Sequence, residues 1–188
     1  MSDVTALLEA IQHGGPKAAE DLLPLVYEEL CKLAARKMAI EPAGHTLQPT
    51  ALVHEAWLRL GGGEGAQFEN RAHFFGAAAE AMRRILIERA RRRLAAKRGA
   101  GAEHLDLDEL EIASPLADDD VLLQLNEALE KFSAVDARKA ELVKLRYFVG
   151  MSFEEASTVL GIAVPTAKQW WAYARAWLKV EMRGAGPG

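Results

Sequence analysis

The sequence predicts an all-α protein made of two small helical domains. Half of its residues are hydrophobic, and Ala, Leu, Arg and Glu are abundant, whereas runs of β-branched residues typical of strands are scarce. Apolar residues recur at three- and four-residue intervals, with Gly and Pro between the periodic stretches. A chain of 188 residues has room for two such domains. We place them at residues 1–98 and 118–188, joined by an acidic linker at residues 99–117.

The first domain should contain several short helices followed by one long helix. Pro16 is expected to open a helix that breaks near Pro24, because an internal proline removes a hydrogen bond. Gly14 and Gly15 are expected to end the first helix, and Gly61 to end the helix that runs to Leu60. Asn70 is a suitable N-cap for the long helix, whose apolar residues fall on one face. The expected helices are residues 3–13, 16–24, 25–38, 48–60 and 71–97.

The second domain should contain four helices, of which the last two form a helix-turn-helix. Ser152 and Glu155 have the spacing of a capping box, which marks a helix start. Gly161 can adopt the positive φ of a tight turn, and Ser157 is small where the two helices would cross. This pattern over residues 152–175 is typical of DNA-binding proteins, although an ordinary helical hairpin remains the alternative. The expected helices are residues 118–132, 136–148, 152–160 and 165–182.

The outward face of the last helix has the composition of a recognition helix. Such a helix reads base edges with its N-terminal residues and binds phosphate through Lys or Arg. We expect Thr166 and Gln169 to read bases, and Lys168 and Arg175 to hold phosphates. Trp170 would either contact DNA or pack against a neighbouring helix. The predicted DNA contacts of this helix are Pro165, Thr166, Lys168, Gln169, Trp170, Tyr173 and Arg175.

The long helix of the first domain is rich in arginine. Residues 71–98 contain nine Lys or Arg and only two Asp or Glu, too few acids to balance the cations by pairing along the helix. The phosphate backbone of DNA is the expected partner, although the acidic linker could neutralise the arginines instead. Phe74 and its aromatic neighbours could stack on unpaired bases or pack in the core. The predicted contacts are Phe74, Arg83, Arg84, Arg89, Arg91, Arg92, Arg93, Lys97 and Arg98.

Several classes of function are disfavoured by the sequence. The single Cys31 cannot form an intrachain disulfide, and no stretch has a zinc-ligand spacing, so we expect no metal or other cofactor. His45, His54, Glu55 and His73 could gather at a metal, but they lack H-E-x-x-H spacing. No export signal and no membrane span is evident. We therefore expect a cytoplasmic protein that is not an enzyme and has no catalytic residues.

The chain resembles the extracytoplasmic-function (ECF) sigma factors over nearly its whole length. The resemblance rests on Leu142–Phe148 leading into Ser152–Glu155, on Leu160–Ile162, and on Ala174–Leu178. It implies a sigma factor that binds core RNA polymerase and directs promoter-specific transcription initiation. The helix 165–182 would then read the minus-thirty-five element, and Phe74–Arg93 would bind the minus-ten element. A stand-alone helix-turn-helix regulator is the alternative function.

The resemblance also assigns a polymerase-binding helix, with one departure from the family. Relatives usually begin this helix with acidic residues, but Gln48–Ala51 contains none. This acid-free form resembles the subgroup associated with serine/threonine kinases, so phosphorylation of Thr50 could supply the missing charge, unless Thr50 only starts the helix. The sequence therefore leaves open whether a kinase or an anti-sigma protein controls the activity. Arg84 stands where many relatives have asparagine. The predicted polymerase contacts are Leu52, Val53, His54, Glu55, Trp57 and Leu58.

Overall fold

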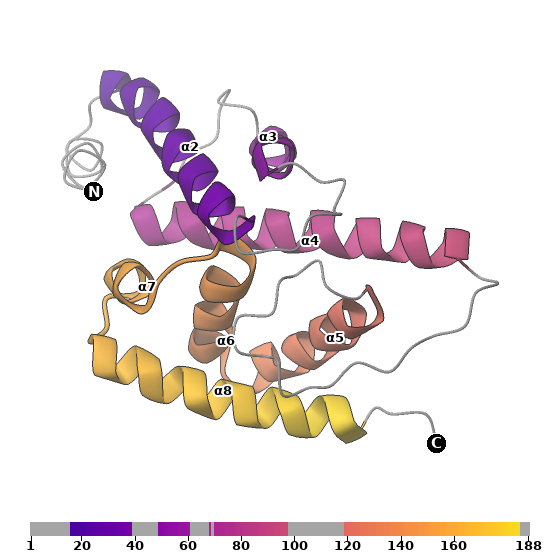
Figure 1. Cartoon of the computed structure of the whole chain (residues 1–188). Helices are drawn as coiled ribbons and strands as arrows, with labels where there is room; N and C mark the ends of the chain where they lie inside the picture. The colour runs from indigo at the N-terminus through magenta and orange to yellow at the C-terminus, as the bar shows by residue number, and fades with distance from the viewer. Residues whose placement is uncertain (1–15, 39–48, 61–67, 69, 98–118, 185–188) are drawn as a thin grey trace.

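The computed structural model describes residues 16–38, 49–60, 68, 70–97 and 119–184, and within these the regular structure is entirely helical (Figure 1). The all-α prediction is confirmed for this part of the chain. The expected helix over residues 3–13 and the acidic linker lie outside the described residues, so the two-domain division stays a prediction. The elements are α2 (Pro16–Met38), α3 (Pro49–Arg59), α4 (Arg71–Lys97), α5 (Asp119–Val135), α6 (Ala137–Lys144), the π-helix η2 (Leu145–Val149), α7 (Phe153–Leu160) and α8 (Val164–Gly184).

Helix α2 is continuous through Pro24, so the predicted break there is wrong. Proline has no N–H to donate, and the carbonyl four residues earlier loses its intrahelical partner. Pro24 itself is exposed, which leaves this side of the helix open to water that can hydrate the carbonyl. The apolar stripe predicted beyond the proline is present, since Leu30, Leu33 and Ala34 are buried.

Helix α4 runs across the molecule, with α2 and α3 on one side and α5, α6 and α7 on the other (Figure 1). It begins as predicted, because Asn70 Oδ1 accepts a hydrogen bond of 2.9 Å from the His73 N–H. Three consecutive residues, Ile85, Leu86 and Ile87, are buried, and successive helical residues point about 100° apart. The helix is therefore covered on more than the single face that its apolar spacing predicted.

The helices beyond residue 118 pack against α4 and one another. The Asp136 carboxylate caps α6 by accepting a hydrogen bond of 3.0 Å from the Lys139 N–H. The expected helix over residues 136–148 is present, but its last turn is the π-helix η2, which ends at Gly150 with φ 86°. The buried apolar residues on both sides of the predicted linker belong to one core cluster. In the described part of the chain, no helix combines the length and apolar character that a membrane span requires.

The connection between α7 and α8 has the predicted local features. Ser152 Oγ accepts from the Glu155 N–H at 3.1 Å, and the Glu155 carboxylate accepts from the Ser152 N–H at 2.7 Å, which completes the capping box. Gly161 ends α7 in the left-handed region, with φ 65° and ψ 37°. The Ile162 N–H then donates to the Ser157 carbonyl at 3.0 Å. These bonds set the direction in which the chain enters α8.

Gly161→Ala should lower the free energy of unfolding by about 1 to 2 kcal/mol, because a side chain disfavours the left-handed backbone. A Cβ at Gly161 meets no atom within 4 Å, so the loss comes from the backbone conformation and not from a clash. Gly161→Asn is the matched control and should lose less, since asparagine tolerates this conformation. Urea denaturation followed by circular dichroism measures both variants. Equal stability of Gly161→Ala and wild type would contradict the assigned turn.

Candidate nucleic-acid interface

The N-terminal half of α8 presents most of the predicted DNA-contacting side chains to solvent. Ala167, Ala174 and Leu178 are buried against the core, which turns the opposite face of the helix outward. Sequence reasoning did not name Ala172 and Ala176, which are exposed and continue the outward stripe from Gln169 by helical spacing. Of the predicted contacts, Pro165, Lys168, Gln169 and Tyr173 are exposed, whereas Thr166, Trp170 and Arg175 are half-buried.

Trp170 packs against α6, which favours the packing alternative left open for this residue. The Arg138 guanidinium carbon lies 5.3 Å from the centre of the Trp170 ring, and Lys139 Nζ lies 5.4 Å from it. Arg138 also donates to the Leu160 carbonyl at 3.4 Å, beside the turn into α8. Sequence reasoning missed these two cations because only the packing of α6 on α8 brings them beside Trp170.

Arg146 connects η2 with both helices of the α7–α8 pair. Its guanidinium carbon lies 3.6 Å from the centre of the Phe153 ring on α7 and 4.9 Å from that of Trp171 on α8. Its Nη1 donates to the Met151 carbonyl at 3.1 Å. Burial lowers the pKa of the Arg146 guanidinium from its ordinary value, and the nearby Glu154 opposes this effect. Arg146 thus helps fix the angle at which α8 is held, a role that its place in the sequence did not indicate.

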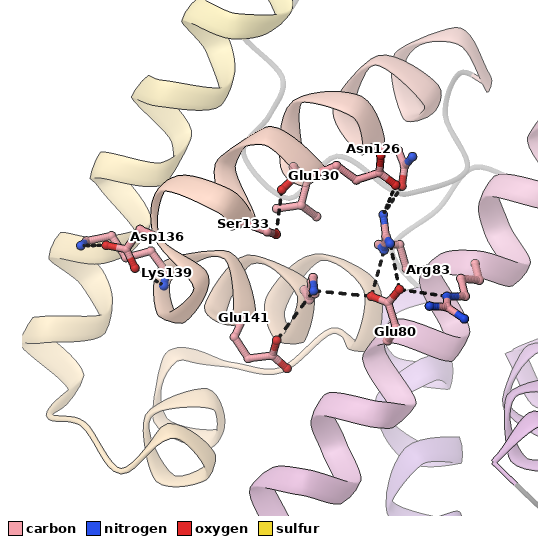
Figure 2. A network of polar contacts seen from close by, with 11 residues as sticks. Glu80, Arg83, Asn126, Glu130, Ser133, Asp136, Lys139 and Glu141 are labelled. Atoms are coloured by element: carbon pink, nitrogen blue, oxygen red, sulfur yellow. Dashed lines mark hydrogen bonds and ion pairs between the residues drawn. The ribbon is translucent and has the colours of Figure 1, made fainter.

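Arg83, a predicted minus-ten contact, is turned inward between α4 and α5 (Figure 2). Its side chain is only 11% exposed, and its Nη2 lies 2.8 Å from Glu80 Oε1. Its Nη1 donates to the buried Asn126 amide oxygen and lies 3.5 Å from Glu130 Oε1. In this arrangement the guanidinium group is occupied by protein partners and offers no free donor edge to phosphate.

Most of the other predicted basic contacts of α4 fall into two groups. Arg89 and Arg93 are bound by acids from other helices, Glu55 at 2.8 Å and Asp119 at 2.6 Å. The sequence analysis considered acids along α4 and in the linker, and it did not name Glu55 of α3 or Asp119 of α5 as partners. Lys97 ends α4, but its side chain and all of Arg98 lie outside the described residues. Arg84, Arg91 and Arg92 are exposed, although Arg84 and Arg92 also pair with acids one turn earlier on α4.

Phe74 lies in the core, so the structure supports the packing interpretation of this residue. It is 2% exposed, and its ring meets Phe68 edge-on at 5.0 Å and Phe75 at 5.3 Å between centroids. No face of the ring is open to a base in this arrangement. His73 is exposed at the same end of α4 and meets Phe68 at 5.6 Å.

The pKa values of two carboxylates between α4 and α6 are shifted in opposite directions. Burial would raise the pKa of Glu80, but Arg83, Lys144 and Arg84 outweigh burial and lower the pKa to about 2. Burial raises the pKa of Glu141; Lys144 opposes this rise, and Glu80 adds a smaller upward effect. Glu141 Oε1 lies so close to α4 that a Cβ at Gly76 would be 2.8 Å from it. Gly76 thus leaves room beside α4 for the Glu141 carboxylate of α6.

Of the six predicted polymerase contacts on α3, some are buried in the core and others are exposed. Leu52 and Val53 are buried, and Trp57 is half-buried with its ring edge-on to Tyr27 at 5.5 Å. Glu55 is held by Arg59 and Arg89, at 3.2 Å and 2.8 Å. His54 and Leu58 are exposed, and with Thr50 they form a stripe at four-residue intervals. We call Thr50, His54 and Leu58 the α3 stripe.

The described residues named for the metal alternative lie on two helices, with His54 and Glu55 on α3 and His73 on α4. Among all the described residues, no group of three His, Cys, Asp or Glu side chains that could hold a metal ion is present. His54 is exposed on α3 and Glu55 is held by arginines, while His45 lies outside the described part of the chain.

Comparison with protein families gives one match. A family model described as ECF sigma factor matches residues 1–184. No curated protein matches the chain. The matched range contains every described helix, from α2 to α8, and therefore both candidate nucleic-acid surfaces and the α3 stripe.

Glu80→Gln and Glu141→Gln should change stability in opposite directions at pH 7. A lowered pKa means that ionised Glu80 stabilises the fold at pH values above its ordinary pKa of 4.5. Glu80→Gln should therefore lower the free energy of unfolding by about 2 kcal/mol at pH 7. This loss should shrink as the pH falls towards 2. A raised pKa means that ionised Glu141 opposes folding. Glu141→Gln should therefore raise the free energy of unfolding by on the order of 1 kcal/mol at pH 7. That gain should vanish below about pH 4.5, where Glu141 is protonated in both states.

Urea denaturation at a series of pH values measures these differences. Each variant serves as the control for the other, because both exchange a glutamate for its neutral isostere at neighbouring positions of one network. A loss of stability in Glu141→Gln at pH 7 would contradict the assigned burial of that carboxylate.

Proposed function

Because the chain belongs to the ECF sigma factor family, it is a sigma factor that directs transcription initiation, and we propose that it binds core RNA polymerase and contacts promoter DNA through two separate surfaces. The family match carries this proposal, since it extends over both surfaces. The exposed half of α8 supports one DNA contact, and the exposed arginines of α4 support the other. Neither surface needs a cofactor for these contacts.

The α8 surface suits the minus-thirty-five element. Lys168 and Gln169 are exposed in the first turns of α8, where a recognition helix meets base edges and phosphates. We assign base reading to Gln169 with Thr166 and phosphate binding to Lys168 with Arg175. Trp170 supports α8 from the side of α6, and Tyr173 stands half-exposed beside it.

The α4 surface suits the minus-ten element. Arg84 and Arg92 are 67% and 75% exposed, and Arg91, which precedes Arg92, is exposed as well. Their ion pairs along the helix are surface pairs, which are worth little and can be exchanged for phosphate. Arg84 replaces the asparagine of many relatives, so base preference at this position is not transferred from them.

The α3 stripe suits a contact with core RNA polymerase. Leu58 is a large apolar residue that is 59% exposed, and it gives the α3 stripe one apolar side chain that a partner could bury. Because Leu52 and Val53 serve the core, we assign the contact to Thr50, His54 and Leu58, with Trp57 at its edge. Glu55 keeps a role in holding Arg59 and Arg89 beside this surface.

Thr50 stands where a phosphate would complete this surface. Helix α3 begins at Pro49 and has no acid in its first turn, and Thr50 is exposed there. A phosphate group at a helix N-terminus is stabilised by the free N–H groups and the helix dipole. We propose that phosphorylation of Thr50 by a serine/threonine kinase strengthens binding to polymerase. That an anti-sigma protein is a further partner remains a prediction from the family resemblance.

Lys168→Ala should weaken promoter binding and initiation about tenfold, because removal of one phosphate contact weakens binding to every sequence and lowers the salt slope by about 0.9. Run-off transcription from genomic fragments by purified core polymerase plus this protein measures the effect. Lys131→Ala is the matched control, since Lys131 is an exposed lysine that pairs with Glu181 away from the first turns of α8. Absence of any transcript with the wild-type protein would favour a stand-alone regulator instead.

Thr50→Glu should bind core polymerase more tightly than Thr50→Ala, by about threefold, because a carboxylate in the first turn partly replaces a phosphate. Pull-down of core polymerase by wild type and both variants measures this order. Phosphorylated wild type should capture more core polymerase than the unphosphorylated wild type and both variants. Equal capture of wild type, Thr50→Ala and Thr50→Glu would refute the switch while leaving the sigma factor assignment intact.

A further inference from the structure

The first half of helix α8 carries its basic residues on one flank only. Lys168 and Arg175 are about two helical turns apart and therefore share a side of α8. This side faces α7, because Lys168 Nζ lies 5.9 Å from the centre of the Phe153 ring. We call the opposite side of α8 the aromatic flank. Its aromatic residues recur at three- and four-residue intervals: Trp170, Tyr173 and Trp177.

A helix that lies in the major groove of DNA has a phosphate backbone along each of its two flanks. Phosphate contacts fix the register and orientation of such a helix, so we expect cations on both sides of it. Lys168 and Arg175 supply them on the α7 side. The cations for the aromatic flank must come from a neighbouring helix, and α6 packs against α8 on that side (Figure 1).

Arg138 of α6 is held at the aromatic flank by two contacts. Its guanidinium carbon lies over the Trp170 ring, 5.3 Å from the centre, and its Nη2 donates to the Leu160 carbonyl at 3.4 Å. The residue is nevertheless exposed. A guanidinium group over a ring uses its planar face there, and the N–H donors at its edge stay available to other acceptors. Arg138 is thus pre-organised to bind phosphate.

The neighbouring Lys139 is engaged in a different way. It is half-buried, and its Nζ pairs with the Asp136 carboxylate and lies 5.3 Å from the centre of the Tyr173 ring. Among the described residues, no carboxylate forms an ion pair with Arg138, whose contacts are the ring and the carbonyl. Arg138 can therefore bind a phosphate without first giving up an acid, and of the two cations it is the better suited to DNA.

We infer that Arg138 is a phosphate contact of the minus-thirty-five surface, placed by Trp170 on the flank of α8 opposite Lys168 and Arg175. The backbone of one DNA strand meets Lys168 and Arg175, and the backbone of the other strand meets Arg138. Trp170 serves this contact by positioning Arg138 and needs no contact with DNA itself. The inference rests on the proposed function, because it takes α8 to be the helix that enters the groove.

The test compares Arg138→Ala with Arg138→Lys in the full chain. Fluorescence anisotropy with a fluorescein-labelled duplex of random sequence gives the affinity over a series of potassium chloride concentrations. Arg138→Ala should weaken binding about three- to tenfold and reduce the slope of log affinity against log salt by about 0.9, because one phosphate contact is lost. Arg138→Lys retains the charge and should keep the wild-type slope. Circular dichroism verifies that the helices remain.

The salt slope separates a phosphate contact from a purely structural role, since loss of packing does not change the number of ions released. Lys131→Ala is the matched control and should keep the wild-type slope, because Lys131 is an exposed cation of α5 that pairs with Glu181. A wild-type slope in Arg138→Ala, or an equal loss of slope in Arg138→Ala and Arg138→Lys, would overturn the inference. If Arg138→Ala fails to fold, Arg138→Gln replaces it with the same expected change, because glutamine is uncharged but still covers part of the Trp170 ring.

Lys168→Ala distinguishes failure of this inference from failure of the proposed function. In the same assay it should reduce the slope by about 0.9, and combined with Arg138→Ala by about 1.8, since the two contacts are independent. If Lys168→Ala reduces the slope and Arg138→Ala does not, α8 remains the DNA-binding helix and Arg138 only packs on Trp170. If neither variant reduces the slope, the assigned minus-thirty-five surface fails, and the inference fails with it.

Discussion

The described structure depends on the burial of helix α4 from two sides. Ile85, Leu86 and Ile87 are buried in succession, which is possible only if helices cover the helix on both sides. Helix α3 packs on α4 from one side, and small residues and paired charges of α4 line a crevice towards α5 and α6. Because α4 contacts α3, α5, α6, η2 and α7, the positions of all these elements are set against it. The basic residues of α4 are thereby divided into exposed and engaged groups.

The division follows from the energetics of a buried guanidinium group. Arginine remains charged in the interior, so a buried arginine must be matched by acceptors. Arg83 obtains them from Glu80 of its own helix and from Asn126 and Glu130, and the latter two tie α4 to α5. Arginines that reach solvent do not need such partners and stay available to DNA. A dense run of one residue type can therefore serve both packing and recognition.

The α7–α8 pair is positioned by local and tertiary contacts acting together. The capping box starts α7 and the left-handed Gly161 ends it, both within a few residues of the turn. The orientation of α8 depends in addition on Arg146, which lies between Phe153 and Trp171, and on Arg138 beside Trp170. Local bonds thus define where the helices begin and end, and aromatic–cation contacts from η2 and α6 hold the reading face outward. That face is the surface on which the proposed recognition of the minus-thirty-five element rests.

The sequence by itself determined the helical class, the start of α4 at Asn70, the capping box at Ser152 and the turn at Gly161, because caps, glycines and apolar periodicity act over a few residues. It also predicted the outward face of α8, since helical spacing places Lys168 and Gln169 opposite Ala167 and Ala174. Only the tertiary structure decided that α2 continues through an exposed Pro24, that Phe74 is buried, and that Arg83, Arg89 and Arg93 are bound by other helices. The arginine contacts depend on partners far away along the chain, and the sequence of one helix does not reveal which acid will be packed against it.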